Sequence, residues 1–295
     1  MLIDFHTHTF PAQIADRAIA QLEKNSHIRS VLSGELSDLT QSMQTAGIDY
    51  SVLLPVVTKP SQQEQINRTA IELNQHFRET GLLSFGGIHP DNDDYDIILR
   101  NLAQNGVRGI KIHPVFQRTY FDDIRYLRII ECACENNLIV VTHAGFDIGF
   151  PGEDFVTPQH ILPVLQQIKP DKLVLAHTGG WDCWEEVEHQ IAGLPVWLDT
   201  SFSITPLRPD PQLFQAEQEK GSDTCAKQFQ KDHPQLDRER FLRIVQTHGA
   251  DRILFGSDSP WSSQLESLTA HKKIGLSQEA LDAILGGNAQ KLLNI

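Results

Sequence analysis

Eight short strand-like runs alternate with longer helix-like segments along this 295-residue chain, and no other feature constrains its fold as strongly. The runs cover residues 2–6, 48–57, 82–88, 107–113, 138–143, 172–177, 195–200 and 252–257. The segments with helical periodicity between them include residues 62–80, 122–136, 158–168, 184–191 and 238–248. Such alternation predicts βαβ units and a parallel sheet. Eight repeats predict an α/β fold whose sheet closes into a (β/α)8 TIM barrel, with an open doubly wound sheet as the alternative.

A long insertion follows the seventh predicted strand. Residues 203–237 contain four prolines, which prevent a continuous helix, and they exceed the usual connection of about two to six residues after a strand. A barrel of this kind needs about 250 residues, so residues 1–295 are expected to form a single domain with this one insertion. Loops after the strands lie on the face that carries the active site. We therefore expect residues 202–214 to cover the barrel mouth as a lid, with a solvated surface loop as the alternative.

Charge and hydropathy narrow the kind of partner. The formal net charge of −13 argues against a nucleic-acid partner, because phosphate backbones bind stripes of Lys and Arg. No run approaches the roughly 18 apolar residues of a membrane span, so no membrane association is expected. The predicted partner is a small-molecule substrate, and self-association into a homo-oligomer stays open.

The cysteines and the N-terminus favour a cytoplasmic location. Cys132, Cys134, Cys183 and Cys225 form no Cys-x-x-Cys pair and suggest no disulfide framework, so reduced thiols are expected. The first residues lack a basic region followed by a long apolar stretch, so no signal peptide is expected.

The first predicted strand ends in two histidines that are two residues apart. Side chains alternate between the faces of a strand, so His6 and His8 are expected to leave one face side by side. Neutral imidazole is a ligand for divalent Zn, Fe, Ni and Cu. The pair therefore supplies half of a candidate metal site.

Further histidines stand where other predicted strands end. Six of the thirteen histidines occupy strand ends: His6, His8, His89, His113, His143 and His177. The C-terminal ends of barrel strands meet at one face, so these side chains are expected to share one site. A catalytic divalent metal takes about three nitrogen or oxygen ligands and keeps one position open. We predict one divalent ion, zinc, at a site built from these donors: His6, His8, His143 and Asp258.

Other residues are expected to act on protons or on the substrate. His177 ends the sixth predicted strand and is placed to move the proton of a metal-activated water, together with Asp258. Lys111 and His113 share one face at the end of the fourth predicted strand and are expected to bind substrate. A structural ion pair for Lys111 and a turn cap for His113 are the alternatives. Arg208 is expected to hold a substrate carboxylate through two parallel hydrogen bonds.

The roles of three more polar residues stay open at this stage. Asp4 is expected to share the face of His6 and His8, where it either orients a neighbouring side chain or is a buried structural carboxylate. Asp199 ends the seventh predicted strand and is either structural or catalytic. His89 precedes a proline and is expected to cap a turn.

Four motifs carry a resemblance to a known family. They read His-Thr-His-Thr-Phe-Pro at 6–11, Gly-Ile-Lys-Ile-His-Pro at 109–114, Ala-His-Thr-Gly-Gly at 176–180 and Gly-Ser-Asp-Ser-Pro at 256–260. Together they resemble the amidohydrolase superfamily, in its amidohydrolase 2 branch, which includes aminocarboxymuconate-semialdehyde decarboxylase and related metal-dependent hydrolases. The resemblance spans the whole chain and says little about the substrate.

The resemblance implies a role for each matching residue. His6, His8, His143 and Asp258 match the ligands of a mononuclear metal, and His177 matches the histidine that helps to activate the metal-bound water. Some members of the superfamily carry a carboxylated lysine on the fourth strand that bridges two metals. Lys111 lies on that strand, so this arrangement is a further alternative to substrate binding.

The predicted function is a metal-dependent hydrolase that acts on a small-molecule lactone, amide or ester carbonyl, with metal-bound hydroxide as the nucleophile. The alternative is a carboxy-lyase that decarboxylates a carboxylated muconate or aromatic acid at the same site. A phosphoesterase with a similar first motif is disfavoured, because Phe10-Pro11 follows that motif where Ser-Asp-Gly is expected. A metal-free binding protein is the remaining alternative, and metal analysis distinguishes it.

Overall fold

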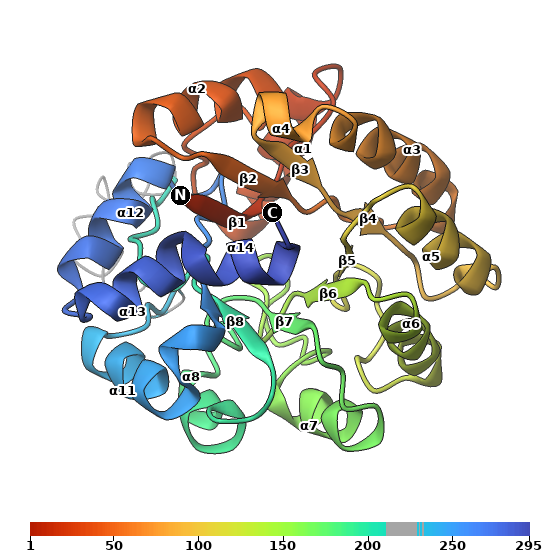
Figure 1. Cartoon of the computed structure of the whole chain (residues 1–295). Helices are drawn as coiled ribbons and strands as arrows, with labels where there is room; N and C mark the ends of the chain where they lie inside the picture. Colours follow the sequence, from red (N-terminus) through yellow and green to blue (C-terminus); the bar gives the residue numbers. More distant parts are fainter. Residues whose placement is uncertain (211–228, 230, 232) are drawn as a thin grey trace, which may run out of the picture.

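The strands form a closed parallel barrel surrounded by helices (Figure 1). The structure is a computed structural model that describes residues 1–210, 229, 231 and 233–295. The strands are β1 (Ile3–Thr7), β2 (Tyr50–Leu53), β3 (Leu82–Ser84), β4 (Gly86–Gly87), β5 (Gly109–Ile112), β6 (Ile139–Thr142), β7 (Leu173–Leu175), β8 (Trp197–Asp199) and β9 (Ile253–Leu254). Every hydrogen-bonded neighbour pair is parallel, and the strands follow one another in sequence order.

Backbone hydrogen bonds at two points make the barrel continuous. β3 and β4 are the two halves of one predicted strand, and Phe85 between them still donates its N–H to Leu53 O at 2.9 Å. At the seam between the first and last strands, Phe5 N–H donates to Phe255 O at 2.7 Å. These contacts exclude the open sheet, and the predicted TIM barrel is confirmed.

Helices cover the outside of the barrel. They are α1 (Ala15–Ser26), α2 (Leu36–Ala46), α3 (Gln63–Asn74), α4 (Phe77–Thr80), α5 (Tyr95–Gln104), α6 (Ile124–Glu135), α7 (Pro158–Gln167), α8 (Trp184–Glu186), α11 (Arg238–His248), α12 (Gln264–Lys273), α13 (Gln278–Asp282) and α14 (Asn288–Leu293). The prediction of one helix over residues 62–80 is wrong, because His76 leaves the helical region (φ −116°, ψ 11°) and separates α3 from α4.

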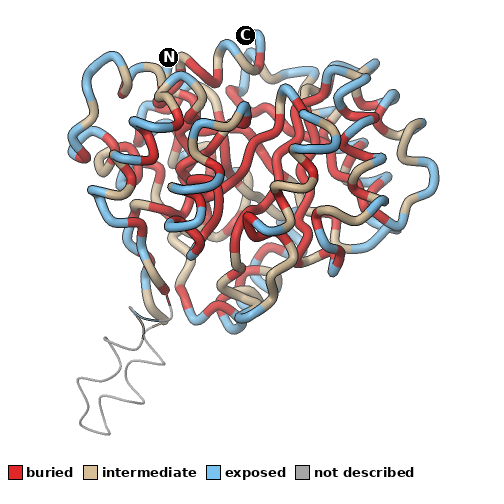
Figure 2. Tube along the Cα trace, turned by 90° about the horizontal axis from the view of Figure 1, so that it is seen from below, coloured by how far each residue is buried: buried red, intermediate tan, exposed pale blue. Residues whose placement is uncertain are grey.

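Two apolar clusters stabilise the two sides of the strands. The cluster in the barrel interior contains Ile3, Phe5, Val52, Leu54, Leu83, Phe85, Ile139, Val141, Val174 and Leu254. Gly109 belongs to this interior, because a Cβ atom there would lie 2.4 Å from the Phe85 ring. The larger cluster joins the outer strand faces to the helices, and Figure 2 shows the buried residues running along the strands. The interior is therefore packed with apolar side chains.

The described part of the insertion pairs with the segment after α1. Arg29 N–H donates to Arg208 O at 2.7 Å, and Asp210 N–H donates to His27 O at 3.1 Å. Residues 211–214 of the predicted lid lie outside the described residues. The lid therefore stays a prediction.

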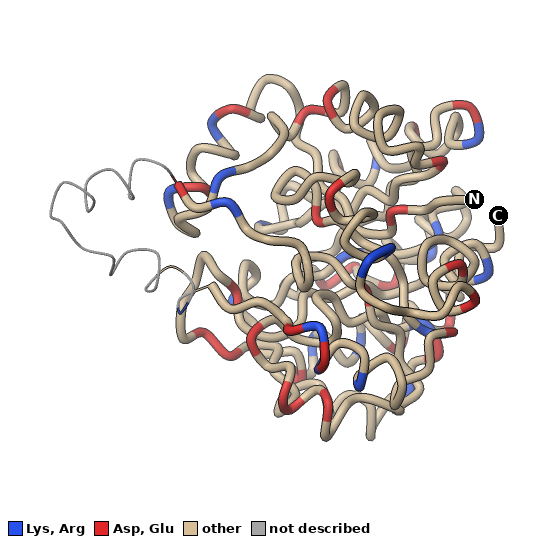
Figure 3. The backbone as a smooth tube through the Cα atoms, turned by 90° about the vertical axis from the view of Figure 1, so that its left-hand side faces the viewer, with Lys and Arg blue, Asp and Glu red and all other residues tan. Residues whose placement is uncertain are grey.

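The outer helices carry charges of both signs (Figure 3), and three of the four cysteines lie among the described residues. Acidic and basic residues are interspersed over the outer helices (Figure 3). Among the described residues, no helix combines the length and apolar character needed to cross a membrane. The described thiols of Cys132, Cys134 and Cys183 are not in disulfides. Cys225 lies outside the described residues, and the cytoplasmic location stays a prediction.

Candidate metal centre

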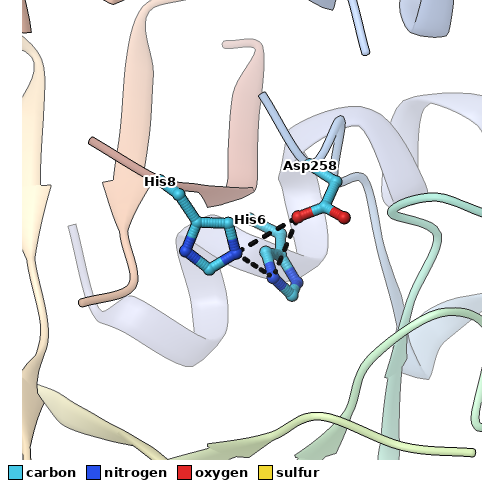
Figure 4. A group of neighbouring side chains, drawn as sticks. All are labelled: His6, His8 and Asp258. Carbon is cyan, nitrogen blue, oxygen red and sulfur yellow. Dashed lines mark hydrogen bonds and ion pairs between the residues drawn. The ribbon is translucent and has the colours of Figure 1, made fainter. Parts of the chain in front are cut away.

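Three predicted ligands meet at the C-terminal end of the barrel (Figure 4). His6 and His8 come from the end of β1, and their Nε2 atoms are 3.1 Å apart. Asp258 follows β9, and its Oδ1 atom lies 3.2 Å from His8 Nε2 and 3.5 Å from His6 Nε2. We call these three residues the inner cluster. Their candidate ligand atoms all lie within 4.8 Å of one another, so one ion can contact all three.

A β-bulge in β1 directs His6 into the barrel. Asp4 pairs with Ser51 and Thr7 pairs with Leu53, so β1 holds one more residue than β2 over this stretch. Bulges of this kind re-aim side chains beside active sites. The expectation that Asp4 shares the face of His6 is therefore wrong: the Asp4 carboxylate accepts hydrogen bonds from the Gln264 amide of α12 and from Ser257.

The outer nitrogens of His6 and His8 are held by fixed acceptors. His6 Nδ1 donates to Asp199 Oδ2, and His8 Nδ1 donates to Leu54 O, both at 2.8 Å. A carboxylate or a carbonyl only accepts, so the outer nitrogen of each ring carries the proton. Both Nε2 atoms therefore present lone pairs to each other and to the barrel centre.

The rings of His143 and His177 are arranged in the same way. His143 Nε2 donates to Phe146 O at 3.0 Å, and His177 Nδ1 donates to Ser201 O at 3.1 Å. Their remaining nitrogens, His143 Nδ1 and His177 Nε2, face each other at 3.0 Å. The ring centroids of His177 and His6 are 5.4 Å apart, so both pairs border the same space.

Paired lone pairs of this kind fit a cation. Burial lowers the pKa of His6 to about 4, assisted by the charge of Lys111, and burial also lowers the pKa of His143 and His177. With the ring protons on the outer nitrogens, the two facing nitrogens of each pair, 3.0–3.1 Å apart, have no hydrogen between them and cannot share a hydrogen bond. A divalent ion accepts such lone pairs, and neutral imidazole together with carboxylate is a donor set that zinc and related metals bind.

Two carboxylates remain ionised beside these rings. Burial alone would raise the pKa of Asp258, but the hydrogen bond with His8 and the nearby His6 hold that pKa well below its usual range. Burial opposes ionisation of Asp199 as well, and the contacts with His6 hold its pKa well below the usual range. The backbones of Asp258 and His177 adopt φ values of 62° and 59°, a left-handed conformation that is uncommon outside glycine and concentrates at functional sites.

Sequence reasoning left the role of Asp199 open and missed Ser201. Asp199 Oδ2 orients His6, while its Oδ1 accepts from the backbone N–H groups of His177 and Ser201 at 3.2 and 3.0 Å. Ser201 Oγ lies 3.0 Å from both His6 Nδ1 and His177 Nδ1. Such contacts to the outer ring nitrogens fix ring orientation and tautomer. The position of Asp199 at a strand end was a usable signal, whereas a serine two residues later carries none.

His143 is not brought into the inner cluster as the fourth ligand. Its candidate ligand atoms group with those of His113 and Asp147. Its inward Nδ1 atom reaches His177 at 3.0 Å, so it lies at the edge of the same space. Asp147 is a second residue that sequence reasoning missed, although a carboxylate four residues after a predicted ligand was a visible signal.

The predicted substrate residues are placed differently from one another. Lys111 is buried, with Nζ 3.5 Å from His6 Nε2, and burial lowers its pKa to about 8 against the attraction of Asp199 and Asp258. His113 is also buried and stacks on His143, with ring centroids 4.3 Å apart.

Arg208 lies at the surface, whereas Phe202, at the start of the predicted lid, lies beside His177. Arg208 Nη2 is 2.6 Å from Glu266 Oε1 of α12, so its described partner is a carboxylate outside the inner cluster. Its predicted role in substrate binding is untested. The Phe202 ring is 6.0 Å from that of His177 and 6.3 Å from that of Trp181. The expected turn cap at His89 is present, because Nδ1 accepts the N–H of Asp91 at 3.2 Å.

Comparison with known structures supports the fold. An uncharacterised TIM-barrel protein from Bordetella bronchiseptica is 18% identical, with a TM-score of 0.73 over 99% of this chain and 98% of the other. A dihydroxybenzoic acid decarboxylase from Polaromonas sp. JS666, solved with bound manganese and 2-nitroresorcinol, is 15% identical, with a TM-score of 0.66 over 99% and 96%. A protein from Pseudomonas putida described as a 2-pyrone-4,6-dicarboxylic acid hydrolase is 19% identical, with a TM-score of 0.61 over 99% and 97%.

Comparison with sequences supports the family. A search of curated proteins found no match. The model of the amidohydrolase family (Amidohydro_2), in contrast, matches residues 3–295. This match covers nearly the whole chain, including all the residues of the inner cluster, and the protein therefore belongs to the amidohydrolase family.

Proposed function

We propose that this protein is a metal-dependent hydrolase that acts on the carbonyl group of a small-molecule lactone, amide or ester. The supporting observation is the set of imidazoles whose inward nitrogens face one another beside the ionised carboxylate of Asp258, while their outer nitrogens donate to fixed acceptors. When bound there, a divalent ion polarises a carbonyl oxygen and makes a water more acidic. We propose zinc as that ion, held by His6, His8 and Asp258 of the inner cluster, with His143 reaching it as a fourth ligand from the edge of the same space.

The chain's own residues would orient the substrate and move protons. Asp258 Oδ1 and the inward Nε2 of His177 are the acceptors proposed to take a proton from water and return it to the leaving group. Lys111, whose Nζ lies 3.5 Å from His6 Nε2, is a buried donor suited to a substrate oxygen or carboxylate. His113 would contact the substrate from the neighbouring strand end, and Arg208 would do so from the insertion.

A carboxy-lyase is the second candidate. Similar structures include the dihydroxybenzoic acid decarboxylase and a 5-carboxyvanillate decarboxylase, which support this candidate. The Pseudomonas putida protein is described as a hydrolase and supports the first candidate. The same inner cluster would serve both reactions, since each requires an acidic centre to hold an oxygen of the substrate.

One assay distinguishes the two reactions. Protein stripped of metal and reloaded with zinc or manganese is incubated in H₂¹⁸O with lactones, amides and carboxylated aromatic or muconate-type acids. Hydrolysis places ¹⁸O in the product acid, whereas decarboxylation releases CO₂ and leaves the product unlabelled. We expect label incorporation that disappears in His8→Asn and persists in His76→Asn, which alters an exposed histidine. Release of CO₂ without label would replace the hydrolase by the carboxy-lyase.

A further inference from the structure

A second group of metal-binding side chains lies beside the inner cluster. His113 follows β5, and His143 and Asp147 follow β6; all three are buried, and their candidate ligand atoms lie within 4.8 Å of one another. We infer that this outer group binds a second divalent cation of the zinc type and competes with the inner cluster for His143. The inference goes beyond the proposed function, because it rests on donor geometry and not on any reaction.

The spacing of the outer group suits an ion better than a hydrogen bond. Asp147 Oδ2 is 3.6 Å from His113 Nε2 and 3.8 Å from His143 Nε2. Both distances exceed the usual 2.7–3.2 Å of an N–H···O hydrogen bond. Ligands about 2.1 Å from a tetrahedral zinc lie roughly 3.4 Å from one another, so a small inward movement of these atoms would complete a site.

Asp147 and His113 are available for such a ligand. Asp147 Oδ1 is already held by Gly149 N–H at 2.8 Å, which leaves Oδ2 directed at the two rings. The His113 Nδ1 atom is buried and has no hydrogen-bond partner among the described residues. His113 therefore differs from the four anchored imidazoles: no protein acceptor explains its orientation, and its Nε2 atom faces Asp147.

His143 can serve only one of the two groups at a time. A neutral imidazole has one lone pair, and in the structure the His143 proton is on Nε2, donated to Phe146 O. The lone pair on Nδ1 then faces His177 and the inner cluster. Binding of an ion at Nε2 requires the proton to move to Nδ1, which withdraws His143 from the inner cluster. Excess metal is therefore expected to weaken the inner centre.

The test counts bound metal. Protein stripped with a chelator is dialysed against buffered zinc over a wide range of free concentration, and zinc per chain is measured by mass spectrometry. We expect two steps, with the second at least roughly tenfold weaker because it must displace the His143–Phe146 hydrogen bond. A single step that ends at one zinc per chain and persists in Asp147→Asn would overturn the inference. A single step that Asp147→Asn abolishes would instead refute the proposed inner centre.

Variants assign each step to its group. Asp147→Asn should remove the weak step and keep the tight one, while Asp154→Asn, which alters a carboxylate in the same loop but outside both groups, should keep both steps. His113→Gln provides a second test of the outer group if Asp147→Asn unfolds by circular dichroism. Survival of the weak step in both Asp147→Asn and His113→Gln would overturn the inference.

A cobalt titration tests whether the inner cluster and the outer group compete for His143. Co²⁺ at the inner cluster has a visible absorption spectrum that depends on its ligands. We expect this spectrum to change when the second equivalent binds to the wild type, and to stay constant in Asp147→Asn at the same cobalt concentration. A spectrum that is unaffected by the second equivalent in the wild type would contradict the competition for His143.

Discussion

At the scale of single residues, the candidate centre separates ligands from the groups that orient them. His6 and His8 present Nε2 to the centre only because Asp199 and Leu54 hold their other nitrogens. His177 has the same inward nitrogen but faces His143 rather than Asp258. Mutations at these positions should therefore affect metal affinity and turnover to different extents.

His177→Asn should retain most of the metal and lose most of the turnover. The residue is assigned to proton transfer, a role that typically contributes roughly 10²–10⁴-fold to rate. Metal retention is measured by competition with a chelator, and turnover by the label assay described above. His143→Asn is the comparison, because loss of that predicted ligand should release the metal. If both variants release metal at the same chelator concentration, His177 is a ligand and its assignment to proton transfer is wrong.

Asp199→Asn should lower the affinity for the metal, although Asp199 is not itself a predicted ligand. The amide cannot accept the charged hydrogen bond from His6 as strongly, and loss of such an orienting partner typically lowers metal affinity by roughly 10–100-fold. Competition with a fluorescent chelator measures this change. Asp171→Asn, at an exposed carboxylate, should leave the affinity as it is. An unchanged affinity in Asp199→Asn would mean that Ser201 alone orients the ring.

At the scale of elements, the bulge in β1 could not be predicted from the alternation of residues along that strand. Strict alternation places Asp4 on the face of His6, whereas the observed pairing gives β1 one more residue than β2 between Asp4 and Thr7 and so breaks the alternation. The bulge depends on the partner strand, which the local sequence of β1 does not contain. The side-by-side placement of His6 and His8, in contrast, needs only two residues of one strand and is confirmed.

The loop after β9 offers a matched pair of hydroxyl deletions. Ser257 Oγ donates to Asp4 and accepts the N–H of Ser259, so Ser257→Ala leaves the Ser259 N–H without this partner and removes one of the hydrogen bonds to the Asp4 carboxylate. We expect this change to lower the free energy of unfolding by about 1–3 kcal/mol in urea denaturation. Ser259→Ala removes a buried hydroxyl that has no partner among the described residues, and it should be close to neutral. Equal losses in the two variants would contradict the role given to the Asp4 contact.

The insertion can be tested through Arg208 and its partner. Arg208→Ala should raise KM for an acidic substrate far more than for a neutral one, since a bidentate contact to a carboxylate would be lost. Glu266→Ala only frees the guanidinium from its described partner and should not raise KM. Identical effects of the two changes on both substrates would show that Arg208 anchors the insertion to α12 and does not reach the substrate.

At the scale of the whole molecule, the barrel is the most predictable feature. Eight alternations, with polar residues at the strand ends, predict both the closed sheet and the face that carries the site. The assembly of side chains that lie far apart in sequence is less predictable. The outer group of His113, His143 and Asp147 arises because two loops meet beside the site, and this depends on their conformations. The insertion has no periodicity, so its course could not be predicted.

Stability should fall in mild acid because of two buried histidines outside the site. Burial lowers the pKa of His271 and of His248 from the usual histidine value of 6.5 to about 4, in the latter case assisted by the charge of Arg252. Between pH 4 and pH 6.5 the unfolded chain binds more protons than the folded chain. The free energy of unfolding therefore rises with pH over this range, and the stability is lost as the pH falls toward 4. The difference amounts to roughly 3 kcal/mol for each histidine.

Urea denaturation between pH 4.5 and 7 measures this slope. His271→Gln should flatten it, whereas His76→Gln, at an exposed position, should leave it as in the wild type. A slope that is unchanged in His271→Gln would assign the acid sensitivity to other groups.

The seam between β1 and β9 determines when the donors of the inner cluster can come together. Asp4 and Ser257 are 253 residues apart and bonded to each other, and the inner cluster draws on both sides of this seam. During synthesis, His6 and His8 are made about 250 residues before Asp258. Until Asp258 is made, the two imidazoles lack the carboxylate that completes the inner cluster. The complete donor set therefore exists only in molecules whose β1 and β9 have already met.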